Sequence, residues 1–306
     1  MPLPLANPTF ESRSTGTCQD NRGDNRDDNR DTDAIFDAPV PLRFWHLTSL
    51  DAPTVAVVWS LSFAWAAGIH LPAWVPALLA LGTWTAYVCD RMLDARGALR
   101  KGNVQSLRER HFFHWRHRRV LAPLAVLAGS IAAAIIFVYM PVGSRERNSV
   151  LAVATLAYFS GVHIPHRPQW LVLLLSKEFL VGVLFAAGCA VPTLSRPHSG
   201  SPAPLLAAVV FFAALAWLNC HAIERWESGA ASSIHTTASL LALVGLLLVI
   251  VCTSQQPRVA ALLLAGSASA FLFAVLDRQR SRLTPIALRA VADLVLLTPL
   301  ALITRI

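Results

Sequence analysis

Long apolar runs separated by short polar segments fill the chain from about residue 50 to its end. Roughly 18 to 21 helical residues cross the ~30 Å hydrocarbon core of a bilayer. Nine runs reach that length, namely residues 52–69, 73–90, 120–140, 148–165, 171–191, 203–221, 235–253, 259–276 and 286–303. The pattern predicts an all-α integral membrane protein with about nine transmembrane helices.

The N-terminal region has a different character. The segment "SRSTGTCQDNRGDNRDDNRDTD" is polar and repetitive and has almost no large apolar side chains. Such a segment cannot bury enough surface to offset the entropy lost on ordering. It also lacks the apolar core of a secretory signal. We therefore expect a disordered polar tail over residues 1–41 and a membrane domain over 42–306.

Composition and charge agree with this division. Hydrophobic residues make up 55% of the chain and charged residues only 14%, with a mean hydropathy of +0.50. Cytoplasmic loops carry an excess of Lys and Arg. If the N-terminus is inside, the inner loops hold 14 basic residues and the outer loops four. We expect a protein of a bacterial-type inner or plasma membrane, with a cytoplasmic N-terminus and an outside C-terminus.

Two pairs of acids lie where predicted spans end. Asp90 and Asp94 follow the second run, and Glu224 and Glu227 follow the sixth. Residues three or four apart share one helix face, and Mg²⁺ often bridges one or two carboxylates to substrate phosphates. The four acids are therefore the candidate catalytic and metal-binding residues, on loops predicted to be cytoplasmic. Their alternative role is to neutralise neighbouring arginines at the membrane boundary.

The two acid pairs lie four helices apart. This spacing predicts two similar halves that face one another across the bundle, with one acid pair in each.

A dense basic and aromatic segment, "LRERHFFHWRHRR", spans Leu107–Arg119. Arginine presents a planar fork of donors that fits phosphate oxygens, so Arg108 and Arg110, together with Arg91, are candidate substrate-binding residues. The alternative for the whole segment is binding to anionic lipid headgroups. Its three histidines are spaced by three residues, which turns each by about 60° on a helix and argues against one shared metal ion.

Charges inside membrane spans are costly and mark functional sites by default. Lys177 and Asp293 lie at similar predicted depths in the fifth and ninth runs, and Asn219 lies near the end of the sixth. We expect these three residues to line one substrate cavity. The alternative for Asp293 is an i, i+4 ion pair with Arg289 that fixes helix packing.

These motifs resemble those of the UbiA-type intramembrane prenyltransferases. The first family motif reads Asn-Asp-x-x-Asp-x-x-x-Asp, and the matching stretch here is "AYVCDRMLD". Asp90 and Asp94 match the last two acids, whereas Ala86 and Tyr87 stand where the family has Asn and its first Asp. The second motif region, "NCHAIERWE", keeps an Asn and two acids at a different spacing, and "KEFLVGVLFAAG" is similar to the fifth helix of these enzymes.

The resemblance implies a nine-helix UbiA-like bundle and a Mg²⁺-dependent enzyme. Such an enzyme ionises an isoprenyl diphosphate to an allylic carbocation, and the expected outcome is prenyl transfer to an aromatic or lipid acceptor. Aromatic rings shield such cations, which makes Tyr87 a candidate substrate-binding residue. The expected partners are the isoprenyl diphosphate, its acceptor and the lipid bilayer, with no nucleic acid.

Two alternatives remain open. The cation can be captured by its own double bonds, as in the terpene cyclases of the same family. A second alternative is a non-catalytic transporter or assembly factor. Transporters place polar groups near the bilayer midplane, whereas most acids here gather near one predicted surface, which favours an enzyme.

Overall fold

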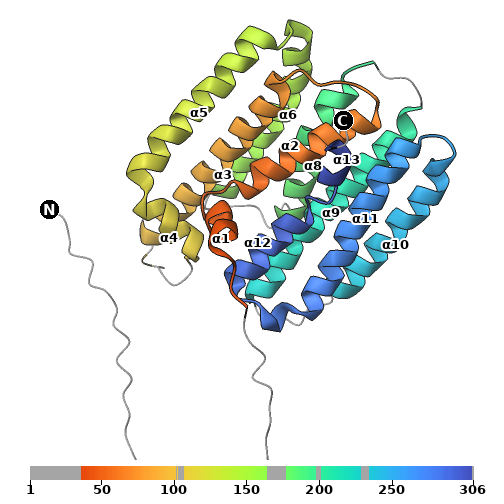
Figure 1. The fold of residues 1–306 in the computed structure, drawn as a ribbon. Helices are drawn as coiled ribbons and strands as arrows, with labels where there is room; N and C mark the ends of the chain where they lie inside the picture. The colour runs from red at the N-terminus through yellow and green to blue at the C-terminus, as the bar shows by residue number, and fades with distance from the viewer. Residues whose placement is uncertain are drawn as a thin grey trace, which may run out of the picture. The chain divides into compact units, whose positions relative to one another are not determined.

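Helices form every regular element in the part of the chain that the computed structural model describes (Figure 1). The described residues are 36–304 without 101, 103–106, 164–176, 198–200 and 229–233. The α-helices are α1 (Val40–Leu47), α2 (Asp51–Ala66), α3 (Trp74–Arg100), α4 (Glu109–Arg116), α5 (Arg118–Tyr139), α6 (Val142–His163), α8 (Lys177–Leu194), α9 (Pro202–Ser228), α10 (Ile234–Thr253), α11 (Pro257–Arg278), α12 (Pro285–Val295) and α13 (Leu300–Ile303). The prediction of an all-α protein is confirmed.

Four of these helices, α5, α9, α10 and α11, are long and apolar enough to cross a membrane. A fifth span results if α1 and α2, which meet at an angle of 87°, form one broken span, and α8 adds a shorter apolar helix. Because a bilayer offers no partners for backbone polar groups, spanning segments of this kind must be helical. Candidate membrane spans are therefore present, and the predicted count of about nine is not confirmed.

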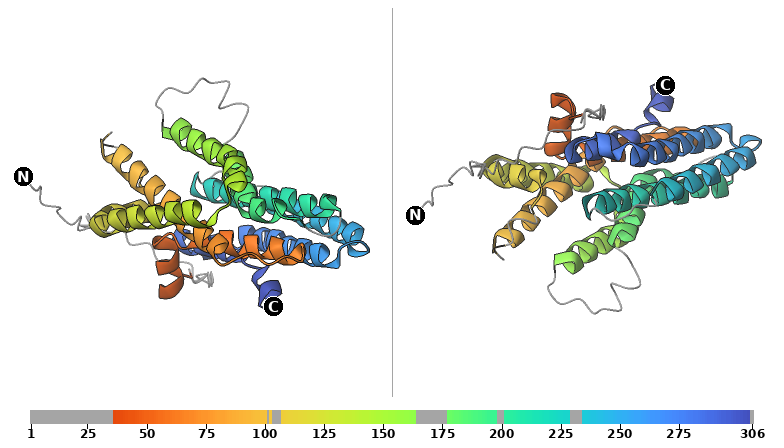
Figure 2. Two further views of the ribbon diagram at one scale, coloured as in Figure 1. Left: turned by 90° about the horizontal axis from the view of Figure 1, so that it is seen from above. Right: turned by 90° about the horizontal axis from the view of Figure 1, so that it is seen from below.

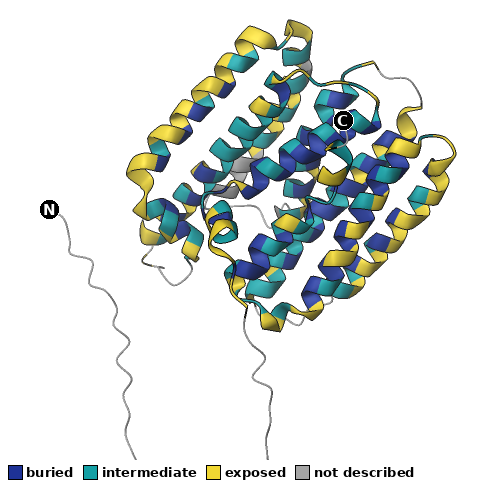
Figure 3. Cartoon of the chain, in the orientation of Figure 1, coloured by how far each residue is buried: buried dark blue, intermediate teal, exposed yellow. Residues whose placement is uncertain are grey.

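The outer faces of two helices carry the apolar surface that a bilayer would cover. On α5, Val126 is 70% exposed and Phe137 is also 70% exposed, and on α10 Ile250 is 73% exposed. Figure 3 shows exposed positions recurring along both helices. Apolar surface of this extent is unusual on a protein surrounded by water, so these faces are the expected lipid contacts.

The main core lies between α2, α8, α9, α10 and α11. The indole of Trp59 stacks on the ring of Phe212 with centroids 3.9 Å apart, and its Nε1 donates to the carbonyl of Leu296 at 2.9 Å. Helices α8 and α9 approach closely at Gly182, where an added Cβ would come within 2.7 Å of the Trp217 backbone nitrogen. This packing holds α9 and α12 in place beside α2.

The ninth predicted helix is not continuous, so the expectation of one helix over residues 286–303 is wrong. The chain forms α12, turns at residues 296–299 and resumes as the short α13. Pro299 lacks an N–H donor and disfavours helical geometry at the residue before it. The hydroxyl of that residue, Thr298, donates to the carbonyl of Ala265 at 2.8 Å, which fixes the turn against α11.

The N-terminal end of the described chain also differs from the expectation. Residues 1–35 of the predicted tail lie outside the described residues. Phe36, which we placed in that tail, donates from its N–H to the Arg282 carbonyl at 2.8 Å and accepts from the Thr284 N–H at 3.0 Å. The helix α1, which the apolar pattern did not predict, follows and packs on α12 and α4.

A sharp bend joins α1 to α2. Ser49 has a φ of 59°, in the left-handed region that non-glycine residues seldom adopt. The indole Nε1 of Trp84 on α3 donates to the Thr48 carbonyl at 3.0 Å, which ties the bend to α3. The bend brings the end of α1 back beside the first residue of α2.

Candidate functional site

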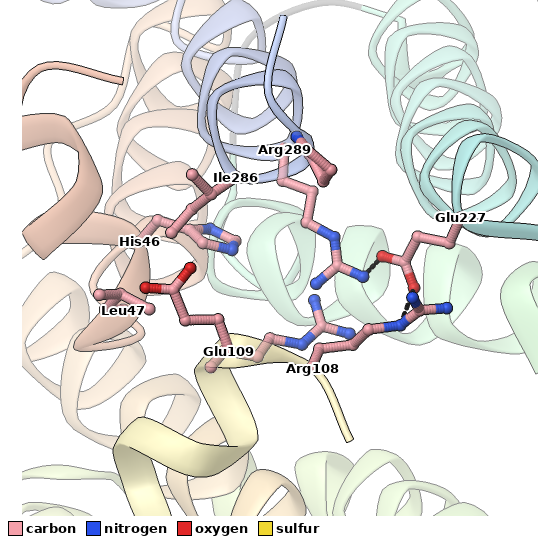
Figure 4. Close-up of a pocket in the computed structure, with 9 residues that line it drawn as sticks. His46, Leu47, Arg108, Glu109, Glu227, Ile286 and Arg289 are labelled. Carbon is pink, nitrogen blue, oxygen red and sulfur yellow. Dashed lines mark ion pairs between the residues drawn. The ribbon is translucent and has the colours of Figure 1, made fainter. Parts of the chain in front are cut away.

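The charged residues of the helical domain gather around two cavities at one end of the bundle. A cavity of about 100 Å³ is lined by His46 of α1, Arg110 of α4 and Arg289 of α12, among others. A second cavity of about 290 Å³ shares Arg108, Glu227 and Arg289 with the first. Residues from α1, from the start of α4, from α9 and from α12 therefore face a common space (Figure 4).

One carboxylate in this space is held by two arginines. Glu227, at the end of α9, forms an ion pair with Arg289, and its Oε2 lies 3.3 Å from Nε of Arg108. Figure 4 shows the two guanidinium groups approaching Glu227 from different elements. The acid therefore satisfies only part of the positive charge around it.

Other arginine donors here have no hydrogen-bond partner among the described residues. Arg91 on α3 is only 5% exposed, and its Nε and Nη1 make no hydrogen bond, nor does Nε of Arg110. The Arg91 guanidinium lies 5.6 Å from the ring centroid of Tyr87. Leaving buried donors of a charged group unpaired costs more than 1–3 kcal/mol, the range for neutral groups.

We call Arg91, Arg108, Arg110 and Arg289 the arginine cluster. The first three lie close enough to Arg289 for their positive charges to repel it. Burial, followed by the charge of Arg91, lowers the pKa of Arg110 to about 10. Even so, Arg110 stays protonated at neutral pH, and the cluster is a concentrated positive region.

Two histidines of α4 set the position of this helix. The Nδ1 of His114 lies 2.8 Å from the Arg110 carbonyl, so it must carry the proton, and Nε2 then accepts from the Ser49 hydroxyl at 3.2 Å. The Nδ1 of His111 accepts from the Arg108 N–H at 3.1 Å. The His114 bonds tie Arg110 to the bend between α1 and α2, and the His111 bond caps the start of α4 at Arg108.

The same bonds require neutral imidazole rings. Burial, followed by the charges of Arg110 and Arg91, lowers the pKa of His111 to about 3. Burial and the charge of Arg91 outweigh the hydrogen bond to the Arg110 carbonyl and lower the pKa of His114 to about 4. Both rings therefore remain uncharged at neutral pH and add no further positive charge to the cluster.

A second group of polar side chains lies next to the arginine cluster, which we call the His46 cluster. The Nδ1 of His46 is 2.7 Å from Oδ2 of Asp51 and 3.4 Å from Oδ2 of Asp293. It is the one set of three His, Cys, Asp or Glu residues in the described chain whose ligand atoms all lie within 4.8 Å of one another. The positive charge of Arg91 acts on Asp51, which links the two clusters.

The structure brings some predicted site residues together. Asn219 donates from Nδ2 to Oδ1 of Asp293 at 3.1 Å, so these two predicted residues are in contact, but neither lines the two cavities described above. The alternative role for Asp293 was a pair with Arg289, but Arg289 pairs with Glu227. Lys177 begins α8, and its side chain lies outside the described part of the structure.

The four carboxylates predicted to bind Mg²⁺ are distributed differently from that expectation. Asp94 is exposed, and its Oδ2 lies 4.0 Å from Nε2 of His111. Figure 2 shows the C-terminal end of α3, which carries this residue, projecting away from the other helices. Asp90 is half-buried and its charge reaches Arg110, whereas Glu224 on α9 is exposed.

The four predicted carboxylates do not form one preformed cluster within the described chain. No three of the predicted ligands converge on one point within the described chain, and Glu227 is already held by two guanidinium groups. Magnesium therefore remains a prediction of the family resemblance.

Sequence reasoning missed His46 and Asp51. Asp51 stands at the boundary between the polar N-terminal region and the first apolar run, where an acid reads as a helix-start charge. Two features of the sequence could have identified the pair: Asp51 adjoins an apolar run, where a charge is costly, and His46 precedes it by five residues.

The arrangement combines a positive region with unpaired donors and an adjacent group of convergent oxygen and nitrogen ligands. The positive region is chemically suited to bind an anion with several oxygens. No protein-family profile, curated protein or solved structure matches the chain.

Proposed function

We propose that the protein is an intramembrane enzyme that binds the diphosphate of an isoprenoid substrate at the arginine cluster. The observation that carries this proposal is the set of buried guanidinium donors on Arg91 and Arg110 that lack partners among the described residues. Arg110 lines the smaller cavity together with Arg108 and Arg289, and the charge of Arg91 acts on Arg110. An anion rich in oxygens would satisfy these donors and offset the charge of the cluster.

The position of Glu227 supports a phosphate-like ligand. Its two carboxylate oxygens lie between Arg108 and Arg289, which is the geometry in which a phosphate group would accept from the same two side chains. In this proposal Glu227 competes with the substrate. Apolar side chains such as Ile286 and Leu288 also line the cavities, and they would contact the isoprenoid chain of the substrate.

The proposed reaction begins with cleavage of the bond between the allylic carbon and the diphosphate oxygen. The electron pair leaves with the diphosphate, and the guanidinium groups stabilise the negative charge that develops on it. The remaining allylic cation is captured by an acceptor in a transferase or by its own double bonds in a cyclase.

The test uses purified full-length protein in lipid nanodiscs with geranyl, farnesyl and geranylgeranyl diphosphate. Release of inorganic diphosphate is measured with and without a hydroxylated aromatic acceptor, in buffer containing Mg²⁺. We expect release that requires the acceptor, and acceptor-independent release would assign a cyclase instead.

Variants connect the reaction to the site. We expect Arg289→Gln to reduce release strongly and the exposed Arg119→Gln to leave it near the wild-type rate. If all three diphosphates bind but none is cleaved, the protein is a carrier or transporter of such lipids. If none binds, the proposed function is wrong.

A further inference from the structure

The His46 cluster has the geometry of a metal site. For metal–ligand bonds of about 2.0 Å, the ligand atoms of a tetrahedral ion lie about 3.3 Å apart. The Nδ1 of His46 lies 2.7 Å from one Oδ2 and 3.4 Å from the other, and these oxygens belong to Asp51 and Asp293. All three ligand atoms fall within 4.8 Å of one another.

Both carboxylates are held so that one oxygen of each remains directed at His46. Oδ1 of Asp51 accepts from the Ala52 N–H at 2.9 Å, and Oδ1 of Asp293 accepts from Asn219 at 3.1 Å. Hydrogen bonds of this kind orient the ligands of metal sites and raise metal affinity. The remaining Oδ2 atoms are the two that face the imidazole.

The surroundings of the His46 imidazole favour a cation at this point. His46 is only 2% exposed, and its Nδ1 lies within 3.4 Å of an oxygen of both carboxylates, so a single ion or proton at this point would be shared by all three side chains. Two carboxylates directed at one ring nitrogen carry negative charge that a divalent ion would offset. A nitrogen ligand beside two oxygens suits zinc and its first-row neighbours, whereas magnesium prefers oxygen ligands alone.

We propose that His46, Asp51 and Asp293 bind a divalent transition metal ion of the zinc type through Nδ1, Oδ2 and Oδ2. Three protein ligands leave a fourth tetrahedral position open, as in catalytic zinc sites. The site lies next to the arginine cluster, because the charge of Arg91 acts on Asp51. It is distinct from the acid pairs on α3 and α9 and does not depend on the isoprenoid proposal.

The experiment measures metal binding directly. The full-length protein is purified in detergent, stripped with a chelator, and titrated with Co²⁺ as a spectroscopic substitute for zinc. We expect one bound ion per chain and the visible absorption bands of a four-coordinate cobalt site. Bound zinc after purification without a chelator, measured by elemental analysis, should approach the same ratio.

Matched variants locate the ion. Asp293→Asn and His46→Gln should lower the affinity at least 100-fold, and Asn219→Ala, which removes only the orienting donor, should lower it roughly tenfold. Asp94→Asn, on the predicted magnesium motif, should bind like the wild type. Asp51→Glu should retain binding but shift the absorption bands, which provides a folded variant that changes the site without removing it.

Two outcomes would overturn the inference. One is a wild-type protein that binds no cobalt or zinc at micromolar free ion, which would show that a proton alone bridges the three side chains. The other is binding that survives in monodisperse Asp293→Asn protein and disappears in Asp94→Asn protein. That result would place the ion on α3 instead.

Discussion

The arginines of the basic segment 107–119 differ in their surroundings. We call Arg110, which lines a cavity, the inner arginine, and we call the exposed Arg116, Arg118 and Arg119 the outer arginines. Arg110 points into the domain, where it lines a cavity and keeps an unpaired Nε. Arg116, Arg118 and Arg119 are exposed, and the Arg118 guanidinium lies 4.6 Å from the ring centroid of Trp115. The difference comes from how α4 packs on α1 and α3. Among the arginines of this charge-rich segment, only Arg108 and Arg110 reach the two cavities.

The largest expected effect is on ligand affinity, and it should differ between the inner and the outer arginines. Arg110→Gln should weaken binding of an isoprenyl diphosphate by about 10- to 100-fold, because a charge-assisted hydrogen bond contributes about 1.5–3 kcal/mol. Arg119→Gln should change the dissociation constant by less than about twofold. Equal losses in the two variants would mean that the whole segment acts through diffuse charge. Both constants are measured in the same nanodiscs at one salt concentration.

The histidines of the same segment allow a second comparison of a buried and an exposed side chain, through the pH dependence of protein stability. The unfolded chain takes up protons near pH 6.5, whereas burial lowers the pKa of folded His114 to about 4. The stability supplied by the neutral ring is complete above pH 6.5 and is lost as the pH falls toward 4. At pH 5.5 the loss amounts to about 1 kcal/mol.

The corresponding measurement is the Tm in detergent at pH 7.5 and pH 5.5. His114→Gln should remove part of the acid-induced decrease in Tm, and the exposed His117→Gln should leave the decrease intact. An identical decrease in wild type and His114→Gln would contradict a neutral buried ring.

The smallest expected effect concerns Glu227, which pairs with Arg108 and Arg289. If its carboxylate competes with the substrate for Arg108 and Arg289, then Glu227→Gln should strengthen diphosphate binding by about three- to fivefold, roughly 1 kcal/mol. A role as a magnesium ligand predicts the opposite, a loss of binding. Isothermal titration with the same diphosphate ligand distinguishes the two signs, with Glu224→Gln as the exposed control on α9.

The sequence was sufficient to predict that the protein is helical and to locate its long apolar helices. The runs that became α5, α9, α10 and α11 were predictable because a bilayer leaves the backbone few alternatives to a helix. The break at residues 296–299 was also readable in principle from Pro299, which the continuous apolar pattern obscured. The count of spans depends on helices such as α3 and α6 that mix polar and apolar residues, and hydropathy alone does not decide it.

The candidate site was predictable only in part. The proximity of Asn219 and Asp293 could be anticipated, because charges inside apolar runs must find partners, and a hydrogen bond joins them. That they line a substrate cavity stays a prediction. His46 and Asp51 were missed because their contact depends on the bend at Ser49, and no local sequence pattern predicts that bend. For Glu227 the spacing specified a helix face but not the two arginines that the fold places against it.

The central claim is that the arginine cluster recognises the diphosphate of an isoprenoid ligand, and one binding comparison tests it most directly. Farnesyl thiodiphosphate, which resists ionisation, and farnesol, which has the same chain without the diphosphate, are titrated into wild-type and Arg110→Gln protein. We predict that the wild type prefers the thiodiphosphate by at least 100-fold and that Arg110→Gln loses most of this preference. Equal affinity of the wild type for both ligands, or a preference unchanged in Arg110→Gln, would contradict the claim.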